Sequence, residues 1–220
     1  MWSNQYMSII FESEYCKQGA IRAVRFNVDG EYCLTCGSDK KIKLWNPHRG
    51  VHLKTYSGHG NDVLDVCGSC DSDRIISAGA DKSVILWDVA TGQPIRRFRG
   101  HTGRPITSAT LTRDSQCYLV SCTDSVIRLL EKDSGELLSE YQGHSTKDFS
   151  IESCLDQSDT YVLSGSTDGN VYCWDLVSSA VKTKYNHGQS LVVSSIIFFW
   201  WDQTFHVHFQ MDVYCHLCAI

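Results

Sequence analysis

Two segments of the chain contain the residue types of a serine-hydrolase triad, each followed by a tryptophan. The first segment carries His59, Ser77, Asp81 and Trp87. The second repeats these types in the same order, as His144, Ser164, Asp168 and Trp174. In such hydrolases an aspartate orients a histidine, which in turn activates a serine as the nucleophile. Acyl-transfer chemistry is therefore the first hypothesis to weigh against the rest of the sequence.

Four residues of types that bind metal ions lie near the end of the sequence. They are His206, His208, Cys215 and Cys218. A Cys-x-x-Cys pair is a common half-site for zinc, but the spacing to the two histidines matches no known zinc finger. A zinc-binding tail is therefore an alternative for this segment. The chain as a whole is expected to need no metal and no cofactor.

An internal repeat changes the meaning of the serine, histidine and aspartate residues. It is marked at steps of 42, 43 and 44 residues by the pairs Trp45-Asn46, Trp87-Asp88, Leu130-Glu131 and Trp174-Asp175. Six positions before each pair stands an aspartate, namely Asp39, Asp81, Asp124 and Asp168. A nucleophile needs one activated serine in one pocket, whereas a motif supplied once per unit performs a structural task once per unit. The sequence therefore predicts no catalytic residue.

Each repeat unit has the pattern of short strands rather than of helices. Residues 42–45 and 84–87 show the pattern of a strand rather than the repeat of a helix, and turn-forming residues such as Asp39 and Gly169 separate such runs. The pair Gly-His recurs thirteen positions after the marker pairs, at Gly58-His59, Gly100-His101 and Gly143-His144. We expect four short antiparallel strands per unit, with the aspartates in the tight turns before the third strands.

A unit of about 40 to 45 residues with Gly-His near its start and Trp-Asp near its end resembles the WD-repeat family, in which each unit is one blade of a β-propeller. The resemblance covers residues 16–188 and implies an all-β fold: a WD-repeat β-propeller with four recognisable blades and an incomplete ring. Residues 1–15 are then an N-terminal segment that can supply a ring-closing strand, with residues 8–15 extended. Residues 189–220 form a divergent tail that can begin a partial fifth blade.

In the WD-repeat family, the histidine, serine, aspartate and tryptophan of a unit form a hydrogen-bonded network, and the resemblance implies this role for both sets. Two units depart from the pattern. One has Leu130 in the tryptophan position and Val120 in the serine position. The first unit has Lys17-Gln18 where Gly-His would fall. We expect these two units to be the less stable ones.

Within the family, residues 19–30, 33–40, 98–101 and 125–130 resemble a scaffold of the mitogen-activated protein kinase pathway. This resemblance implies a non-catalytic protein-interaction scaffold that organises the extracellular-signal-regulated kinase cascade and also associates with the spliceosome. Such a scaffold closes a ring of seven blades. Here Gly103 is followed directly by Arg104, two positions that belong to well-separated blades in the family, so about three blades are expected to be missing. A non-functional truncated splice form or a gene-model product is the alternative.

Partner binding is expected at the loops of one rim, because propeller loops present a broad polar surface. The candidates follow the Gly-His position of each unit: Arg22, Asn61, Arg104 and Asp148. Ordinary solvent-exposed loop residues remain an equally open interpretation. A cullin-type adaptor is a rival, but its Trp-Asp-x-Arg box is absent from the Trp-Asp pairs. Blade faces left uncovered by an unclosed ring also favour self-association.

The composition of the chain indicates which kinds of partner it can bind and in which cell compartment it is located. The net charge of -5 disfavours direct binding of nucleic acid, which needs a concentrated basic surface. The eleven cysteines lack the spacing of a disulfide framework and are interpreted as reduced thiols. No secretory leader is recognisable in residues 1–10, and the most apolar stretch, residues 191–201, is shorter than the ~20 residues of a membrane-spanning helix. A cytoplasmic and nuclear location, without membrane contact, is expected.

Overall fold

The computed structural model describes residues 17–99, 104–146, 149–156 and 158–186. These residues form sixteen strands in four sheets. The first sheet consists of β1 (Ile21–Phe26), β2 (Cys33–Gly37), β3 (Lys41–Asn46) and β4 (Val51–Ser57). The second consists of β5 (Val63–Gly68), β6 (Arg74–Gly79), β7 (Ser83–Asp88) and β8 (Pro94–Arg99). The third consists of β9 (Ile106–Leu111), β10 (Cys117–Cys122), β11 (Ile127–Glu131) and β12 (Leu137–Tyr141). The fourth consists of β13 (Ser153–Leu155), β14 (Tyr161–Gly165), β15 (Asn170–Asp175) and β16 (Val181–Asn186).

Each sheet is one blade, in which every strand pairs antiparallel with the next strand along the chain. The prediction of four consecutive four-stranded antiparallel units is confirmed. The middle strands are buried on both faces, and residues 84–87 in β7 form a continuous apolar run for this reason. The outer strands β4, β8 and β16 are largely exposed and carry lysine or arginine, which discourages pairing with another chain. None of the described residues forms a helix of the length and apolar character that crossing a membrane requires.

The turn between the second and third strands is the same in all four blades. Its aspartate accepts a hydrogen bond from the backbone N–H two residues later, at 3.1 to 3.2 Å. The residue between them has a positive φ: 65° at Lys40, 59° at Lys82, 62° at Ser125 and 82° at Gly169. An aspartate that bonds within its own turn fixes this conformation even where the next residue is not glycine. The predicted positions of Asp39, Asp81, Asp124 and Asp168 are confirmed.

The core lies between the blades rather than within one of them. One cluster joins the first two blades and includes Leu34, Tyr56 and Trp87. A second joins the second and third blades around Phe98 and Tyr118, and a third joins the last two around Tyr141 and Trp174. Each blade therefore depends on its neighbour for burial of its apolar surface.

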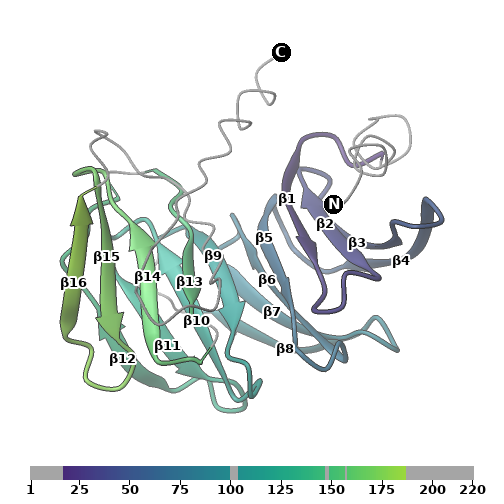
Figure 1. Ribbon diagram of the computed structural model, residues 1–220. Helices are drawn as coiled ribbons and strands as arrows, with labels where there is room; N and C mark the ends of the chain where they lie inside the picture. Colours follow the sequence, from purple (N-terminus) through teal and green to yellow (C-terminus); the bar gives the residue numbers. More distant parts are fainter. Residues whose placement is uncertain (1–16, 100–103, 147–148, 157, 187–220) are drawn as a thin grey trace.

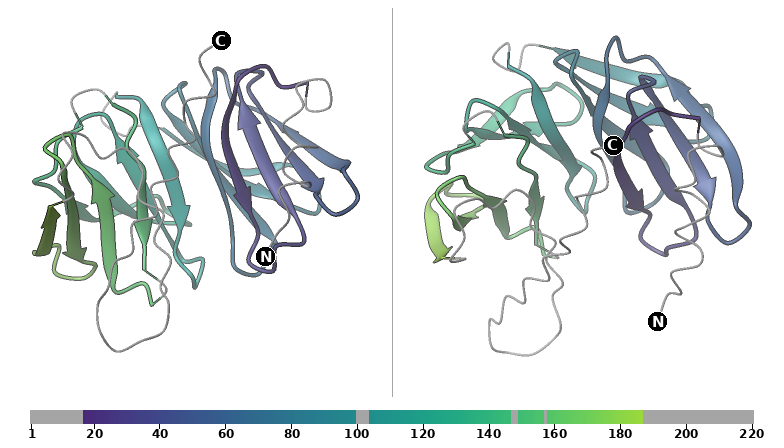
Figure 2. Two further views of the ribbon diagram at one scale, coloured as in Figure 1. Left: turned by 45° about the horizontal axis from the view of Figure 1, so that its top comes forward. Right: turned by 90° about the horizontal axis from the view of Figure 1, so that it is seen from above.

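The four blades stand side by side in chain order (Figure 1). Seen from above, they follow an arc and do not close a ring (Figure 2). The first strands of the blades, β1, β5, β9 and β13, face the inside of the arc. Among the described residues no strand pairing joins one blade to another. The chain is thus an incomplete β-propeller; the segments expected to supply a ring-closing strand (1–15) and a partial fifth blade (189–220) lie outside the described residues.

Candidate functional site

In the second blade, hydrogen bonds connect four side chains in a row: those of Trp87, Ser77, His59 and Asp81. Trp87 Nε1 donates to Ser77 Oγ at 2.9 Å, and Ser77 Oγ lies 2.8 Å from His59 Nε2. His59 Nδ1 lies 3.1 Å from Asp81 Oδ1. Asp81 Oδ2 also accepts the backbone N–H of Gly60 at 2.7 Å. The network joins the loop after β4, strands β6 and β7, and the turn between these two strands.

This connectivity is that of a hydrolase triad, but the surroundings prevent catalysis by Ser77. The Ser77 side chain is fully buried, and its oxygen is occupied by the tryptophan N–H. Burial lowers the pKa of His59, although Asp81 acts in the opposite direction. Burial also acts to raise the pKa of Asp81, but hydrogen bonds from Gly60 and Ser83 hold it below its usual value. A neutral histidine beside a charged carboxylate suits a fixed hydrogen bond that holds the loop in place.

The expectation of the same network in the fourth blade needs correction. Trp174 Nε1 donates to the carbonyl oxygen of Gln142 at 2.9 Å rather than to Ser164. Ser164 Oγ instead donates to the carbonyl oxygen of Gly165. Among the described residues, His144 Nδ1 is buried without a hydrogen-bond partner. The structure therefore does not bring His144, Ser164, Asp168 and Trp174 into one network.

The difference follows from the residue two positions before the turn aspartate. In the second blade this residue is Gly79, where an added Cβ would lie 2.5 Å from both Asp81 Oδ1 and His59 Nδ1. The fourth blade has Ser166 at this position, so a side chain occupies the space that the histidine–aspartate bond requires. Glycine there is the signal that the sequence analysis missed.

In the fourth blade, a different group of hydrogen bonds holds the loop between β12 and β13. Ser166 Oγ accepts the backbone N–H of Ser145 at 3.0 Å, and the N–H of Thr167 donates to the carbonyl oxygen of Ser145 at 2.8 Å. The Tyr172 hydroxyl donates to Asp168 Oδ2 at 2.8 Å, while its ring stacks on Trp174. Burial would raise the pKa of Asp168, but the bonds from Ser166 and Tyr172 lower it to about 2.

The first blade contains a network that the sequence analysis expected to be broken. Trp45 Nε1 donates to Thr35 Oγ1 at 2.9 Å, and Thr35 Oγ1 donates to Gln18 Oε1. Gln18 Nε2 reaches Asp39 Oδ1 at 3.5 Å and the carbonyl oxygen of Lys41 at 3.2 Å. Because an amide offers both an acceptor and a donor, Gln18 occupies the position of the histidine. Gly37 stands two positions before Asp39, as Gly79 does before Asp81, but a Cβ at Gly37 would meet the backbone carbonyl of Ala20 rather than the side chains of the network.

In the third blade, an ion pair replaces the network. Arg128 Nη2 lies 2.9 Å from Asp124 Oδ2, and Arg128 Nε lies 3.1 Å from Glu140 Oε1. Burial acts to lower the pKa of Arg128, but its bond to Asp124 raises it overall. The position two residues before the turn aspartate holds Cys122 in this blade, and the histidine of the unit, His101, lies outside the described residues.

Three of the four predicted rim residues, Arg22, Asn61 and Arg104, lie at one end of the inner strands. The network described above holds Gly60, and the N–H of Ala80 donates to the carbonyl oxygen of Asp62 at 2.8 Å. Between these bonds Asn61 is exposed. Arg22 Nη2 forms a salt bridge of 3.0 Å with Asp62 Oδ2, which connects the rims of the first two blades.

Two further rim candidates belong to the last two blades. Arg104 is exposed just before β9, at the corresponding end of the third blade. Asp148 lies outside the described residues.

A charged group connects the blades at the inside of the arc. Arg25 Nη2 lies 2.9 Å from Asp65 Oδ1 and 2.9 Å from Glu152 Oε1, and Asp65 Oδ2 accepts the N–H of Ala109 at 3.3 Å. Burial raises the pKa of Asp65 to about 7, while Arg25 acts to lower it. These contacts come from all four blades, so they hold the inner edges together.

The thiols of Cys67 and Cys122 are free, and burial raises the pKa of both to about 11. Such thiols are poor nucleophiles and poor metal ligands near pH 7. Within the part of the chain that the structure describes, no three His, Cys, Asp or Glu side chains gather to hold a metal ion. The four residues of the zinc hypothesis, His206, His208, Cys215 and Cys218, lie outside it.

Comparison with known proteins agrees with the four-bladed architecture. The family described as WD domain, G-beta repeat, matches residues 11–46, 50–88, 92–130 and 135–175. The third match runs without interruption across Gly103 and Arg104. Proteins of this family are generally non-catalytic and mediate contacts between proteins.

Several whole-length relatives share the repeats. The chain is 42% identical over 260 residues to WD repeat domain-containing protein 83 of Homo sapiens, covering 81% of this chain and 82% of that protein. The protein of the same name in Danio rerio has the same identity and coverage. An uncharacterized WD repeat-containing protein of Schizosaccharomyces pombe is 30% identical over 257 residues, covering 80% of this chain and 86% of that protein. The chain belongs to the WD-repeat family.

Proposed function

We propose that the chain is a non-catalytic scaffold that binds other proteins through the rim carrying Arg22, Asn61 and Arg104. The proposal rests on the hydrogen bonds that His59, Ser77 and Asp81 form. These residues hold the loop before β5 in one conformation, so that Asn61 and the Arg22–Asp62 pair are presented at fixed positions. A rigid, polar rim lowers the entropic cost of binding a partner.

The partners are proposed from the resemblance of the sequence to the mitogen-activated protein kinase organizer. They are components of the extracellular-signal-regulated kinase cascade and of the spliceosome. The chain would bind them in the cytoplasm and the nucleus. The likeness to WD repeat domain-containing protein 83 over most of the chain supports this choice. The charge of -5 favours protein partners over direct contact with nucleic acid.

We also propose that this chain is a shortened form of such a scaffold, lacking whole repeats between Gly103 and Arg104. The alignment with the human relative spans 260 residues, but 81% of this 220-residue chain is only about 178 residues. About 80 aligned positions thus have no counterpart here, which corresponds to two repeats of 42 to 44 residues rather than the three expected from the sequence. Loss of whole repeats preserves the phase, as the uninterrupted match over residues 92–130 requires.

Affinity purification with quantitative mass spectrometry tests the rim. The tagged chain is compared with a variant carrying Arg22→Ala, Asn61→Ala and Arg104→Ala. Arg49→Ala, an exposed arginine in the β3–β4 turn at the opposite rim, is the matched control. We expect the triple variant to lose most of any recovered kinase-cascade or splicing proteins and the control to keep them. Equal recovery with all three chains would place the binding surface elsewhere and contradict the proposal.

A further inference from the structure

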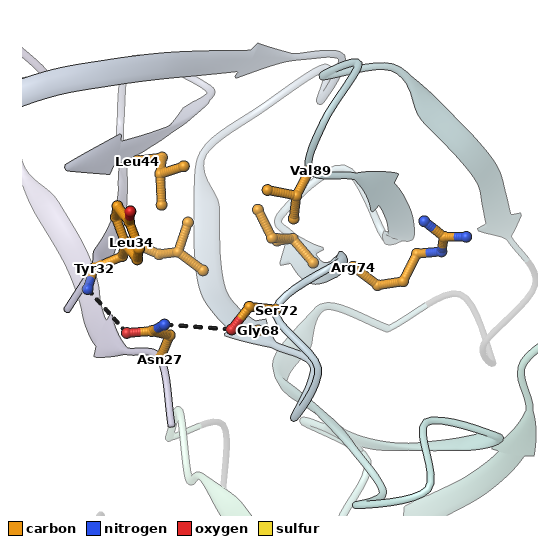
Figure 3. Close-up of a pocket in the computed structure, with 9 residues that line it drawn as sticks. Asn27, Tyr32, Leu34, Leu44, Gly68, Ser72, Arg74 and Val89 are labelled. Atoms are coloured by element: carbon orange, nitrogen blue, oxygen red, sulfur yellow. Dashed lines mark hydrogen bonds between the residues drawn. The ribbon is translucent and has the colours of Figure 1, made fainter. Parts of the chain in front are cut away.

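A cavity of about 270 Å³ opens between the first two blades, at the strand ends opposite the rim described above. Its apolar lining includes Leu34 and Leu44 from the first blade and Val89 from the second (Figure 3). Asn27 Nδ2 donates to Ser72 Oγ at 3.3 Å and connects the two blades at its edge. The volume is below the ~300 Å³ at which pockets for whole small molecules begin, and it suits one inserted side chain.

The cavity exists because a glycine stands in a position that is apolar and large in the other blades. Gly68 pairs with Ile75 at the end of the first strand, and the corresponding residues are Phe26, Leu111 and Leu155. Leu111 is buried in the core between the second and third blades. A Cβ at Gly68 would lie 3.8 Å from Leu34 Cδ1, an ordinary contact. A side chain there would therefore project into the cavity without a clash.

The rim of the cavity carries negative charge. Two turns line this edge of the cavity. The first contributes Asn27 and Tyr32, and the exposed Asp29 and Glu31 lie between them in the sequence. The second contributes Ser72, which stands between the exposed Asp71 and Asp73. Arg74 lines the wall with its stem, and its guanidinium lies 2.8 Å from Asp88 and 3.5 Å from Asp73, so it offsets part of this charge. Asp71 and Asp73 share the Ser69 hydroxyl, and burial together with Asp71 raises the pKa of Asp73. A cation placed beside these carboxylates would relieve their repulsion.

We propose that this cavity is a second protein-binding site, which takes an apolar side chain of a peptide segment whose neighbouring residues are arginine or lysine. The apolar side chain fills the space next to Gly68, and the basic residues lie against the two acidic turns. Tyr32, 40% exposed, offers its ring to the same cations. The site lies at the opposite rim from the proposed scaffold surface, and both blades precede Gly103, so it is independent of the proposed function and of the shortening.

Fluorescence polarisation with synthetic peptides tests the proposal on the full chain. The probes are labelled eight-residue peptides with one leucine, methionine, phenylalanine or tryptophan followed by two arginines. Companion peptides replace the apolar residue by serine or the arginines by glutamate. The decisive variant is Gly68→Leu, which copies the third blade and fills the cavity; its melting temperature should be unchanged or raised. A second variant, Asp71→Asn with Asp73→Asn, removes charge, and Asp114→Asn, in the equivalent turn of the third blade, is its control.

We expect at least one apolar–arginine peptide to bind saturably below about 1 mM. Gly68→Leu should weaken binding at least tenfold, and the double asparagine variant at least threefold with a smaller salt dependence. Asp114→Asn should have no effect. The proposal is overturned if no peptide binds, if serine or glutamate companions bind equally well, or if Gly68→Leu leaves binding unchanged. It is equally overturned if Gly68→Leu lowers the mass seen by light scattering, because a second copy of the chain would then be the occupant.

Discussion

In the second and fourth blades, the residue two positions before the turn aspartate decides whether the histidine–aspartate bond can form. This residue is Gly79 in the second blade, where His59 bonds Asp81. It is Ser166 in the fourth blade, where His144 Nδ1 has no partner among the described residues. The presence of the histidine, serine, aspartate and tryptophan in a repeat unit is therefore not enough to form the network. The histidine and aspartate also need space to meet.

Gly79→Ser is expected to destroy the network of the second blade. The new Cβ would overlap Asp81 Oδ1 and His59 Nδ1, and separating them leaves buried polar groups without partners. We expect the free energy of unfolding to fall by about 2 kcal/mol or more in urea melts. Ser166→Gly in the fourth blade is the matched change and should cost less than Gly79→Ser. A loss of equal size in both would show that the glycine position does not control the network.

Gln18 tests whether an amide replaces histidine in the first blade. Gln18→Met keeps the size of the side chain but leaves Thr35 and Asp39 without their partner, which should cost about 1 to 3 kcal/mol. Gln18→His supplies the residue used in the second blade and should keep most of the stability. Chemical denaturation measures both. If methionine and histidine were equally harmful, the hydrogen bonds of Gln18 would not be what stabilises this blade.

His144 makes the stability of the chain depend on pH. Burial lowers its pKa to about 4, whereas a histidine in an unfolded chain titrates near ~6.5. Between these values the unfolded chain binds more protons, so the contribution of His144 to stability is present above pH ~6.5 and is lost as the pH falls toward 4. The difference in unfolding free energy between the wild type and His144→Phe should change by on the order of 3 kcal/mol from pH 7 to pH 4.

Asp65 titrates in the opposite sense over this range, but it is present in both chains and cancels in the comparison. A difference between wild type and His144→Phe that stays constant with pH would mean that His144 is solvated or paired in solution.

At the scale of elements, the three interfaces between adjacent blades, here called seams, differ in whether their buried hydroxyl groups form hydrogen bonds. Tyr56 Oη donates to the carbonyl oxygen of Val89 at 3.3 Å across the first seam, and Tyr141 Oη donates to that of Leu176 at 2.6 Å across the third. At the second seam the corresponding residue is Phe98, which has no hydroxyl. There, among the described residues, the buried Tyr118 Oη has no hydrogen-bond partner. The junction that we propose between Gly103 and Arg104 falls between these two blades, and an unsatisfied hydroxyl is consistent with the proposed loss of the original neighbouring blades.

Tyr118→Phe should therefore stabilise the chain. Removing a buried hydroxyl without a partner relieves a desolvation cost of about 1 kcal/mol or more. Tyr141→Phe is the matched control and should lose about 1 kcal/mol, because its hydroxyl is bonded. Thermal or urea melts of the two variants measure the contrast. A stabilisation by Tyr141→Phe, or a loss from Tyr118→Phe, would show that the second seam is as well satisfied as the third.

The sequence predicted the elements well because their signals are local. The marker pairs and turn aspartates determine strand order and phase, and Asp39, Asp81, Asp124 and Asp168 lie where the pattern requires. It predicted the polar network of the second blade. It did not predict the hydrogen bonds of the first and fourth blades, since these depend on packing between distant positions. Ser166 excludes a bond between residues 24 positions apart, and Gln18 reaches Asp39 only once β1 and β2 are paired. The cavity beside Gly68 likewise becomes visible only when the four blades are compared in register.

At the scale of the whole molecule, the described residues form an arc in which the first and fourth blades have no neighbouring blade on one side. The contacts of Arg25 with Asp65 and Glu152 connect the inner edges, but they do not cover the apolar faces at the two ends. Side chains such as Phe26, which is 47% exposed, illustrate that uncovered surface. Exposed blade faces favour association with a second copy or with chaperones.

The most direct test of this account compares the present chain with one that has the ~80 residues of the relatives restored between Gly103 and Arg104. Light scattering gives the mass of each chain, and affinity purification gives the recovery of kinase-cascade and splicing proteins. A partner that reads loops from several blades loses central contacts when blades are missing, and each such contact is worth about 2 kcal/mol or more. We predict that the restored chain is monomeric and recovers partners at least tenfold better, while the present chain self-associates. A monomeric present chain with undiminished recovery would contradict the account.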